Sequence, residues 1–166
     1  MRPIVNGVVN IKRPSSVGVA TEPPTAERQL SVHVIATTPP GTRAALKQAA
    51  ACVADLDAYI VLLVPQVVPY VQPLDQPAHS PSLVGQRFLD IAGTIGVDVT
   101  IRVCLCRSAS SVASILPDDA LVLVGGRRRW WRTREQRLAA ELTDCGFRAL
   151  FVDTLRATPE ASEPGA

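Results

Sequence analysis

Two short apolar runs without alternation constrain the fold of this chain more than any other feature. The run at 58–64 ends at Pro65, and the run at 120–124 ends at Gly125 and Gly126. A strand with one wet face alternates apolar and polar residues, whereas a strand covered on both faces does not. Both runs therefore predict inner strands of a parallel sheet that has helices on both faces.

Three further segments, at 30–36, 97–105 and 147–152, predict strands from their β-branched and apolar residues. The segment 97–105 alternates strictly, which is typical of a strand with one wet face. We therefore expect 97–105 at an edge of the sheet.

Helices are predicted between the strands from apolar residues at three- and four-residue spacing. They lie around 46–53, between Ser80 and Gly96, and between Thr133 and Gly146, with a short helix or turn at 108–116. Thr133 followed by Gln136 matches a capping box, so the third helix is expected to begin there.

Right-handed crossovers and the burial pattern together predict the topology. The five strands, numbered along the chain, are expected in the order 3-2-1-4-5, in an open, doubly wound α/β sheet. The switch point then lies between the first and fourth strands. Thr37 and Thr38 would face Gly125 and Gly126 across one crevice.

The composition of 166 residues, 47% of them apolar, fits one domain, which we place at 30–153. Residues 1–29 are rich in Pro, Ser, Thr and Glu and predict a flexible segment. Within it, 4–11 contain Asn-Gly between β-prone residues, which fits either a hairpin or a single added strand. Residues 154–166 predict a disordered tail, and the five prolines in 65–81 predict a long loop that cannot be a central strand.

Charge and hydropathy limit the partners that can be expected. The net charge is +2, but six of the 17 Lys and Arg residues lie between Arg127 and Arg137. No apolar run approaches the roughly 20 residues of a membrane span, and the first residues lack the apolar core of a signal peptide. We therefore expect a cytoplasmic protein without a membrane partner.

No catalytic or metal-binding set is evident. The spacing of Cys52, Cys104, Cys106 and Cys145 matches no zinc or disulfide framework, so reduced structural thiols are favoured over a metal site. His33 falls in a central strand, where a hydrogen-bonded core histidine is favoured. The serines at 108–114 have no adjacent base.

In the order and spacing of these elements, residues 30–153 resemble the universal stress protein family of adenine-nucleotide α-hydrolase-like folds. Local similarities are found at 45–50, at 58–64 and at 121–125. The resemblance implies an ATP site, and a homodimer formed through the last strand. In nucleotide-binding members an Asp ends the first strand, and a loop of the form Gly-x-x-Gly, nine residues, Gly-Ser/Thr holds the phosphates. Here Thr37 takes the Asp position, Gly125 matches the first glycine, Arg128 replaces the second, and no later Gly-Ser or Gly-Thr follows, so the resemblance implies a degraded ATP site.

The segment 127–134, rich in arginine and tryptophan, allows four interpretations. It is an anion site for ATP or phosphate, a protein-binding surface, a binding site for single-stranded nucleic acid, or a structural segment in which one tryptophan fills the core and the arginines form a solvated rim with Asp118, Asp119 and Glu135. The candidate anion site comprises Thr37, Thr38, Gly125, Gly126, Arg127, Arg128, Arg129 and Thr133, and the candidate partner surface comprises Trp130, Trp131 and Arg132.

Together these features predict a non-catalytic regulatory or protein-interaction module that resembles universal stress proteins and forms a homodimer. The alternatives are binding of ATP or another phosphate-bearing ligand, and binding of single-stranded nucleic acid. The enzymatic alternative is slow ATP hydrolysis. No certain cofactor is expected, and nucleic acid is the less favoured partner.

Overall fold

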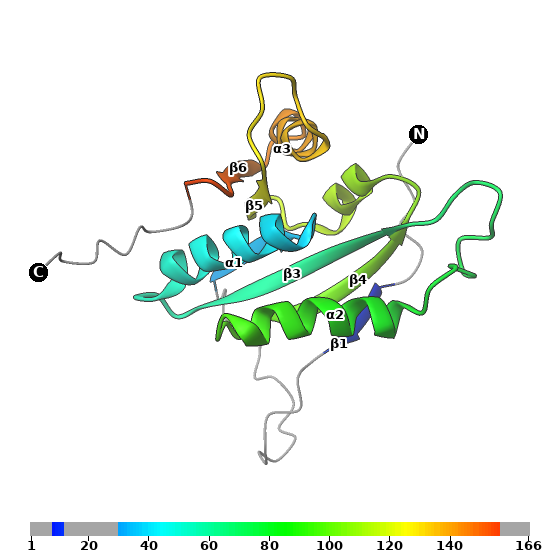
Figure 1. Ribbon diagram of the computed structural model, residues 1–166, viewed down its shortest axis with the longest axis horizontal. Helices are drawn as coiled ribbons and strands as arrows, with labels where there is room; N and C mark the ends of the chain where they lie inside the picture. The colour runs from blue at the N-terminus through cyan, green and yellow to red at the C-terminus, as the bar shows by residue number, and fades with distance from the viewer. Residues whose placement is uncertain (1–7, 12–29, 157–166) are drawn as a thin grey trace, which may run out of the picture.

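A computed structural model describes residues 8–11 and 30–156. The sheet has six strands in the order β1-β4-β3-β2-β5-β6 (Figure 1). The strands are β1 (Val8–Ile11), β2 (Leu30–Ile35), β3 (Ala58–Val67), β4 (Thr100–Cys106), β5 (Leu121–Gly126) and β6 (Arg148–Asp153), and the helices are α1 (Pro39–Val53), α2 (Pro81–Thr94), the 3₁₀ helix η1 (Ala109–Ile115) and α3 (Arg134–Asp144).

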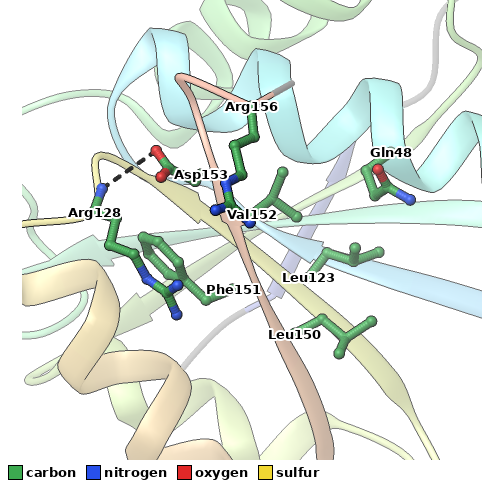
Figure 2. Close-up of a pocket in the computed structure, with 8 residues that line it drawn as sticks. All are labelled: Gln48, Leu123, Arg128, Leu150, Phe151, Val152, Asp153 and Arg156. Atoms are coloured by element: carbon green, nitrogen blue, oxygen red, sulfur yellow. Dashed lines mark hydrogen bonds between the residues drawn. The ribbon is translucent and has the colours of Figure 1, made fainter. Parts of the chain in front are cut away.

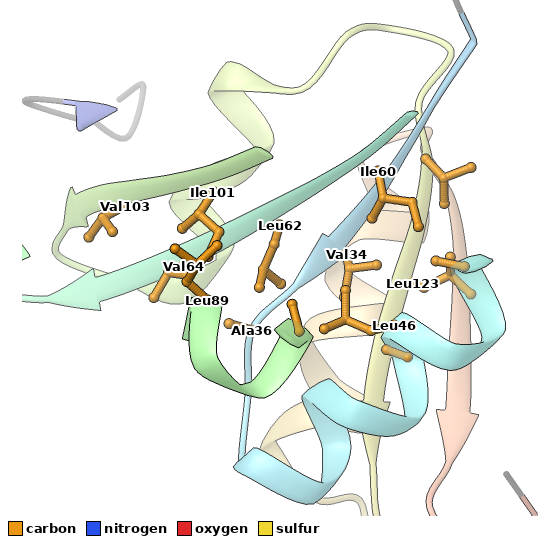
Figure 3. Packing of buried hydrophobic residues seen from close by; sticks show 14 residues of the cluster. Val34, Ala36, Leu46, Ile60, Leu62, Val64, Leu89, Ile101, Val103 and Leu123 are labelled. Carbon is orange, nitrogen blue, oxygen red and sulfur yellow. The ribbon is translucent and has the colours of Figure 1, made fainter. Parts of the chain in front are cut away.

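Helices cover both faces of the sheet. One core lies between the strands and α1 and α2, where Leu46 and Leu89 pack against Val34, Leu62 and Leu123 (Figure 3). The second core lies on the opposite face, under η1 and α3, whose buried residues include Val112, Leu138 and Leu142. The predicted α/β fold with a mostly parallel sheet is confirmed.

The sheet contains one strand more than predicted. The strand β1 pairs antiparallel with β4, from Val8 opposite Cys104 to Ile11 opposite Ile101. Of the two interpretations of 4–11, an added strand is therefore correct for Val8–Ile11, while 4–7 lie outside the described residues.

The expected edge position of the alternating segment 97–105 is wrong, because β1 occupies the outer edge of β4. The face expected to be wet is exposed at Asp98 and half-buried at Thr100 and Arg102, but Cys104 on the same face is completely buried. Cysteine behaves as a small apolar residue in this position, so only the first part of this face is wet.

The loop expected from Pro65 onward begins later, because β3 continues through Pro65 to Val67 and pairs with β4 over that length. The neighbouring strand β2 ends with Ile35 opposite Leu63. From that point β3 has a strand on one side only, and proline is tolerated where its missing N–H faces no partner strand.

The helix boundaries follow their local signals. At α3, Thr133 Oγ1 accepts from the Gln136 backbone N–H at 3.3 Å, and Gln136 Oε1 accepts from the Thr133 N–H at 3.0 Å. The predicted capping box is therefore confirmed. At α2, Pro81 occupies the first turn, where a proline is tolerated, but the Ser80 side chain makes no capping hydrogen bond.

The described residues end in a turn after β6. The Thr154 backbone N–H donates to the Gly126 carbonyl oxygen at 3.0 Å, and the Arg156 N–H donates to the Asp153 carbonyl oxygen at 3.1 Å. The remainder of the predicted tail, 157–166, lies outside the described residues, as do 12–29 of the predicted flexible segment. The turn fixes Leu155 and Arg156 beside the end of β5.

Candidate functional site

The ends of β2 and β5 meet at the predicted switch point. The two strands pair in parallel, with Ile35 opposite Val124. The Thr37 hydroxyl donates a hydrogen bond of 2.6 Å to the Gly125 carbonyl oxygen. The two residues that were expected to face each other across a crevice are therefore in direct contact.

The predicted crevice is filled by backbone at this point. A Cβ atom on Gly125 would lie 1.8 Å from the Gly41 carbonyl oxygen, and one on Gly41 would lie 2.5 Å from the Gly125 carbonyl oxygen. Only two glycines can approach so closely. The start of α1 therefore rests directly on the end of β5 and leaves no room for a phosphate group between them.

The N-terminus of α1 offers few backbone donors to an anion. Pro39 and Pro40 have no N–H. The Gly41 N–H donates to Thr38 Oγ1 at 3.3 Å, and the Thr42 N–H donates to the Thr38 carbonyl oxygen at 2.8 Å. A phosphate site at a helix N-terminus depends on such N–H groups being available, and those of the first turn of α1 are either missing or already used.

The six residues Arg127–Arg132, followed by Thr133, form a surface loop, the arginine–tryptophan loop. All six are exposed, with Trp130 90% and Trp131 58% accessible. The two indole rings contact each other, with centroids 5.2 Å apart and planes inclined by 50°. The interpretation in which one tryptophan fills the core is therefore wrong, since the core beside β5 is completed by Leu138 and Leu142.

Hydrogen bonds fix both ends of the arginine–tryptophan loop. At its start, the Arg128 backbone N–H donates to Asp153 Oδ1 at 3.4 Å (Figure 2). At its end, the capping box holds Thr133 at the start of α3. The loop projects from the end of β5 beside α3 (Figure 1), and its two tryptophans are exposed between these fixed ends.

A pocket of about 290 Å³, which the sequence did not predict, lies beside this loop. Leu123, Leu150 and Val152 point into the space between β6 and α1, and Arg156 lies above them (Figure 2). The pocket is lined by Gln48, Leu123, Arg128, Leu150, Phe151, Val152, Asp153 and Arg156. The only feature of the sequence that could have indicated the pocket is the apolar stretch 149–152. No helix was predicted to cover the side chains on its outer face.

One buried polar residue, His33, lies within β2. His33 is buried and its Nδ1 has no hydrogen-bond partner among the described residues, so the core position is confirmed but the expected hydrogen bond is not found at that atom. Burial, together with the charge of Arg102, lowers the pKa of His33 to about 4. A neutral, enclosed imidazole in this position is not suited to proton transfer with a bound ligand.

Cys104 and Cys106 are also enclosed. Burial raises the pKa of each thiol to about 11, and for Cys104 the neighbouring Cys106 contributes to the increase. The Cys106 thiol approaches the Gln66 carbonyl oxygen at 3.8 Å. Within residues 8–11 and 30–156, no group of three or more His, Cys, Asp or Glu side chains could hold a metal ion.

The proline-rich loop after β3 is held by side chains from neighbouring elements. The Arg107 guanidinium donates to the Val68 carbonyl oxygen at 3.0 Å and lies 5.1 Å from the centre of the Tyr70 ring. Gln66 Nε2 donates to the His79 carbonyl oxygen at 2.7 Å. Tyr70 and His79 themselves are exposed, so this loop is ordered by Arg107 and Gln66 rather than by a buried tyrosine.

Comparisons of the chain with protein-family models, with curated proteins and with solved structures found no match. Among the described residues, no helix is both long and apolar enough to cross a bilayer.

Proposed function

We propose that this chain is a non-catalytic protein-interaction module with a regulatory role, in which the arginine–tryptophan loop is the binding surface. The proposal rests mainly on the exposure of Trp130 and Trp131. Indole groups exposed together in this way are typical of the energetic centre of an interface, where tryptophan and arginine are the most enriched residues. The resemblance to universal stress proteins, inferred from the sequence, implies that the loop follows the strand after which that family binds nucleotide.

The contact between Gly41 and Gly125 supports interaction over nucleotide binding. The backbones of Gly41 and Gly125 meet at the ends of the first and fourth predicted strands, where the resemblance implies a phosphate site. Thr37, in the position of the family's aspartate, is bonded to Gly125. We therefore propose that the nucleotide function has been lost and that the loop serves a protein partner in the cytoplasm.

The alternative function is binding of ATP or inorganic phosphate by Arg127, Arg128 and Arg129. The observation that favours it is the exposure of all three guanidinium groups next to the start of α3, whose positive end attracts anions. This site would lie on the surface of the loop and would not need the closed crevice.

Calorimetric titration distinguishes the two functions. ATP and inorganic phosphate are titrated separately into the wild-type chain and into the double variant Arg127→Ala, Arg129→Ala. The interaction module predicts no saturable heat with ATP at millimolar concentration for either protein. Saturable binding to the wild type that the double variant loses would establish the anion site and reject the interaction module.

We also propose that β6 pairs with β6 of a second copy. β6 is an outer strand of the described sheet, and its Leu150 side chain is 51% accessible. An outer strand with exposed apolar side chains readily pairs with another chain. Sedimentation velocity at micromolar protein should give a dimer for the wild type and a monomer for Leu150→Asp, and a monomeric wild type would reject this part.

A further inference from the structure

We propose that the arginine–tryptophan loop binds an acidic peptide segment that carries apolar side chains, with the tryptophans inserted among those side chains and the arginines paired with the surrounding carboxylates. This inference rests on the proposed interaction function and specifies its partner. The charge, the shape of the tryptophan pair and the fixed base of the loop each contribute to it.

The charge of the loop indicates that its partner is negatively charged. Residues 127–137 contain six arginines and a single acidic residue, Glu135, although the whole chain is nearly neutral. A guanidinium group binds a carboxylate through two parallel hydrogen bonds, which fixes orientation as well as sign. A segment rich in Asp and Glu therefore fits this surface, and a basic or neutral segment does not.

The exposed apolar side chains of the loop indicate that it recognises apolar groups of the partner as well as charge. Trp130 is 90% accessible and contacts Trp131, and Leu155, in the turn at the base of the loop, is 67% accessible. The Leu155 N–H donates to the same Asp153 carboxylate oxygen that accepts from the Arg128 N–H. Apolar side chains surrounded by arginines reproduce the apolar centre and polar rim of a protein interface.

The arrangement of the tryptophans favours protein over nucleic acid. Proteins that bind single strands offer ring faces on which successive bases stack, along a groove that follows the backbone. Here the rings are inclined by 50° and touch each other with centroids 5.2 Å apart, so no base can enter between them. A compact projecting pair of this kind fits instead between aliphatic side chains of a partner.

The fixed base of the loop lowers the cost of binding. The Arg128 N–H is bonded to Asp153 at one end, and the capping box holds Thr133 at the other. Only the few residues between them need to become ordered when a partner binds. Because ordering of loops and side chains subtracts from affinity, a short loop that is fixed at both ends retains more of its contact energy.

Fluorescence provides a direct test, because Trp130 and Trp131 are the two tryptophans of the chain. The probe is a short synthetic peptide composed of Asp and Glu with leucines near its centre. Its comparison peptide has serine in place of each leucine. We expect a saturable blue shift of the emission with the leucine peptide, and at least about tenfold weaker binding of the serine peptide.

Variants identify the groups responsible, and binding is followed by the anisotropy of a labelled peptide so that tryptophan can be replaced. The variant Trp130→Ala and the triple variant Arg127→Gln, Arg129→Gln, Arg132→Gln should each weaken binding of the leucine peptide by about tenfold or more. The matched control, Arg43→Gln with Arg87→Gln, removes exposed charges from α1 and α2 and should bind as the wild type does.

Three results would overturn the inference. Equal binding of the two peptides would remove the role of the tryptophans. Tighter binding of a single-stranded oligothymidine than of the leucine peptide would assign the loop to nucleic acid. The absence of any response to the leucine peptide would reject the acidic partner. The proposed interaction module itself is rejected by a different result, which is saturable binding of ATP or phosphate to the wild type that the double variant Arg127→Ala, Arg129→Ala loses.

Discussion

The hydroxyl group of Thr37 and the carbonyl oxygen of Gly125, 88 positions apart in the chain, are joined by a hydrogen bond of 2.6 Å. The bond connects the end of β2 to the end of β5. Thr37 is itself held by its backbone N–H, which donates to Thr42 Oγ1 at 3.0 Å. These bonds link the two central strand ends and the first turn of α1 into one unit.

Replacement of this hydroxyl should measurably destabilise the fold. Thr37→Val keeps the shape of the side chain but leaves the Gly125 carbonyl oxygen without this donor, so we expect a loss of about 1 kcal/mol in the free energy of unfolding. Urea unfolding followed by far-ultraviolet circular dichroism measures it. The matched control is Thr143→Val, because Thr143 donates only to the Ala139 carbonyl oxygen of its own helix. The free energy of unfolding of this variant should hardly change.

The close approach of Gly41 and Gly125 predicts a larger effect. In Gly125→Ala the new Cβ would meet the Gly41 backbone, which cannot move without shifting α1, so we expect a loss of about 3 kcal/mol in the free energy of unfolding. In Gly85→Ala the new Cβ would meet Ile11 Cδ1, the end of a flexible side chain on the short β1. The loss there should stay below about 1 kcal/mol, and equal losses in the two variants would contradict a rigid contact at Gly125.

Buried His33 predicts that stability falls in mild acid. Its pKa is lowered to about 4 in the folded chain, from 6.5, so the unfolded chain binds a proton first as the pH decreases. The stabilisation is complete above about pH 6.5 and is lost as the pH falls toward 4, which amounts to about 2 kcal/mol between about pH 7.5 and pH 5.

Urea midpoints measured across this range test the assignment. His33→Leu should flatten the dependence between pH 7.5 and pH 5, whereas His79→Leu, which changes an exposed residue, should retain it. A dependence that persists unchanged in His33→Leu would show that another group is responsible.

The enclosed thiols predict selective alkylation. With the pKa of Cys104 and Cys106 raised to about 11, only about one thiol in a thousand is ionised at pH 8. Iodoacetamide should therefore modify exposed Cys145 long before Cys104 or Cys106. Timed alkylation followed by peptide mass mapping measures the order, and both buried thiols should react once urea unfolds the chain. Equal rates for Cys104 and Cys145 in the folded protein would show that η1 opens readily.

Local signals in the sequence were sufficient for most elements of the fold. The capping box at Thr133 and Gln136 and the proline in the first turn of α2 act within a few residues, so their effect does not depend on distant parts of the chain. The unbroken apolar runs likewise identified two inner strands. Pairing with β1 and the passage of β3 through Pro65 were missed because both depend on which strand lies alongside.

The candidate site was predicted in position but not in form. The sequence indicated that Thr37 and Gly125 lie at one switch point, and that arginines and tryptophans follow β5. Whether a tryptophan enters the core depends on the volume left by Leu138 and Leu142. A local sequence pattern does not indicate that volume. The pocket beside β6 was missed for the same reason, since it is the space that α1 leaves uncovered.

The sequence by itself determined which segments become helices and strands, because periodicity, capping and backbone propensity act over a few residues. The tertiary structure alone decided that the switch point is closed, because the meeting of Gly41 with Gly125 depends on how α1 packs against β5. It also decided that Trp130 and Trp131 remain exposed, since burial depends on the space that distant side chains leave.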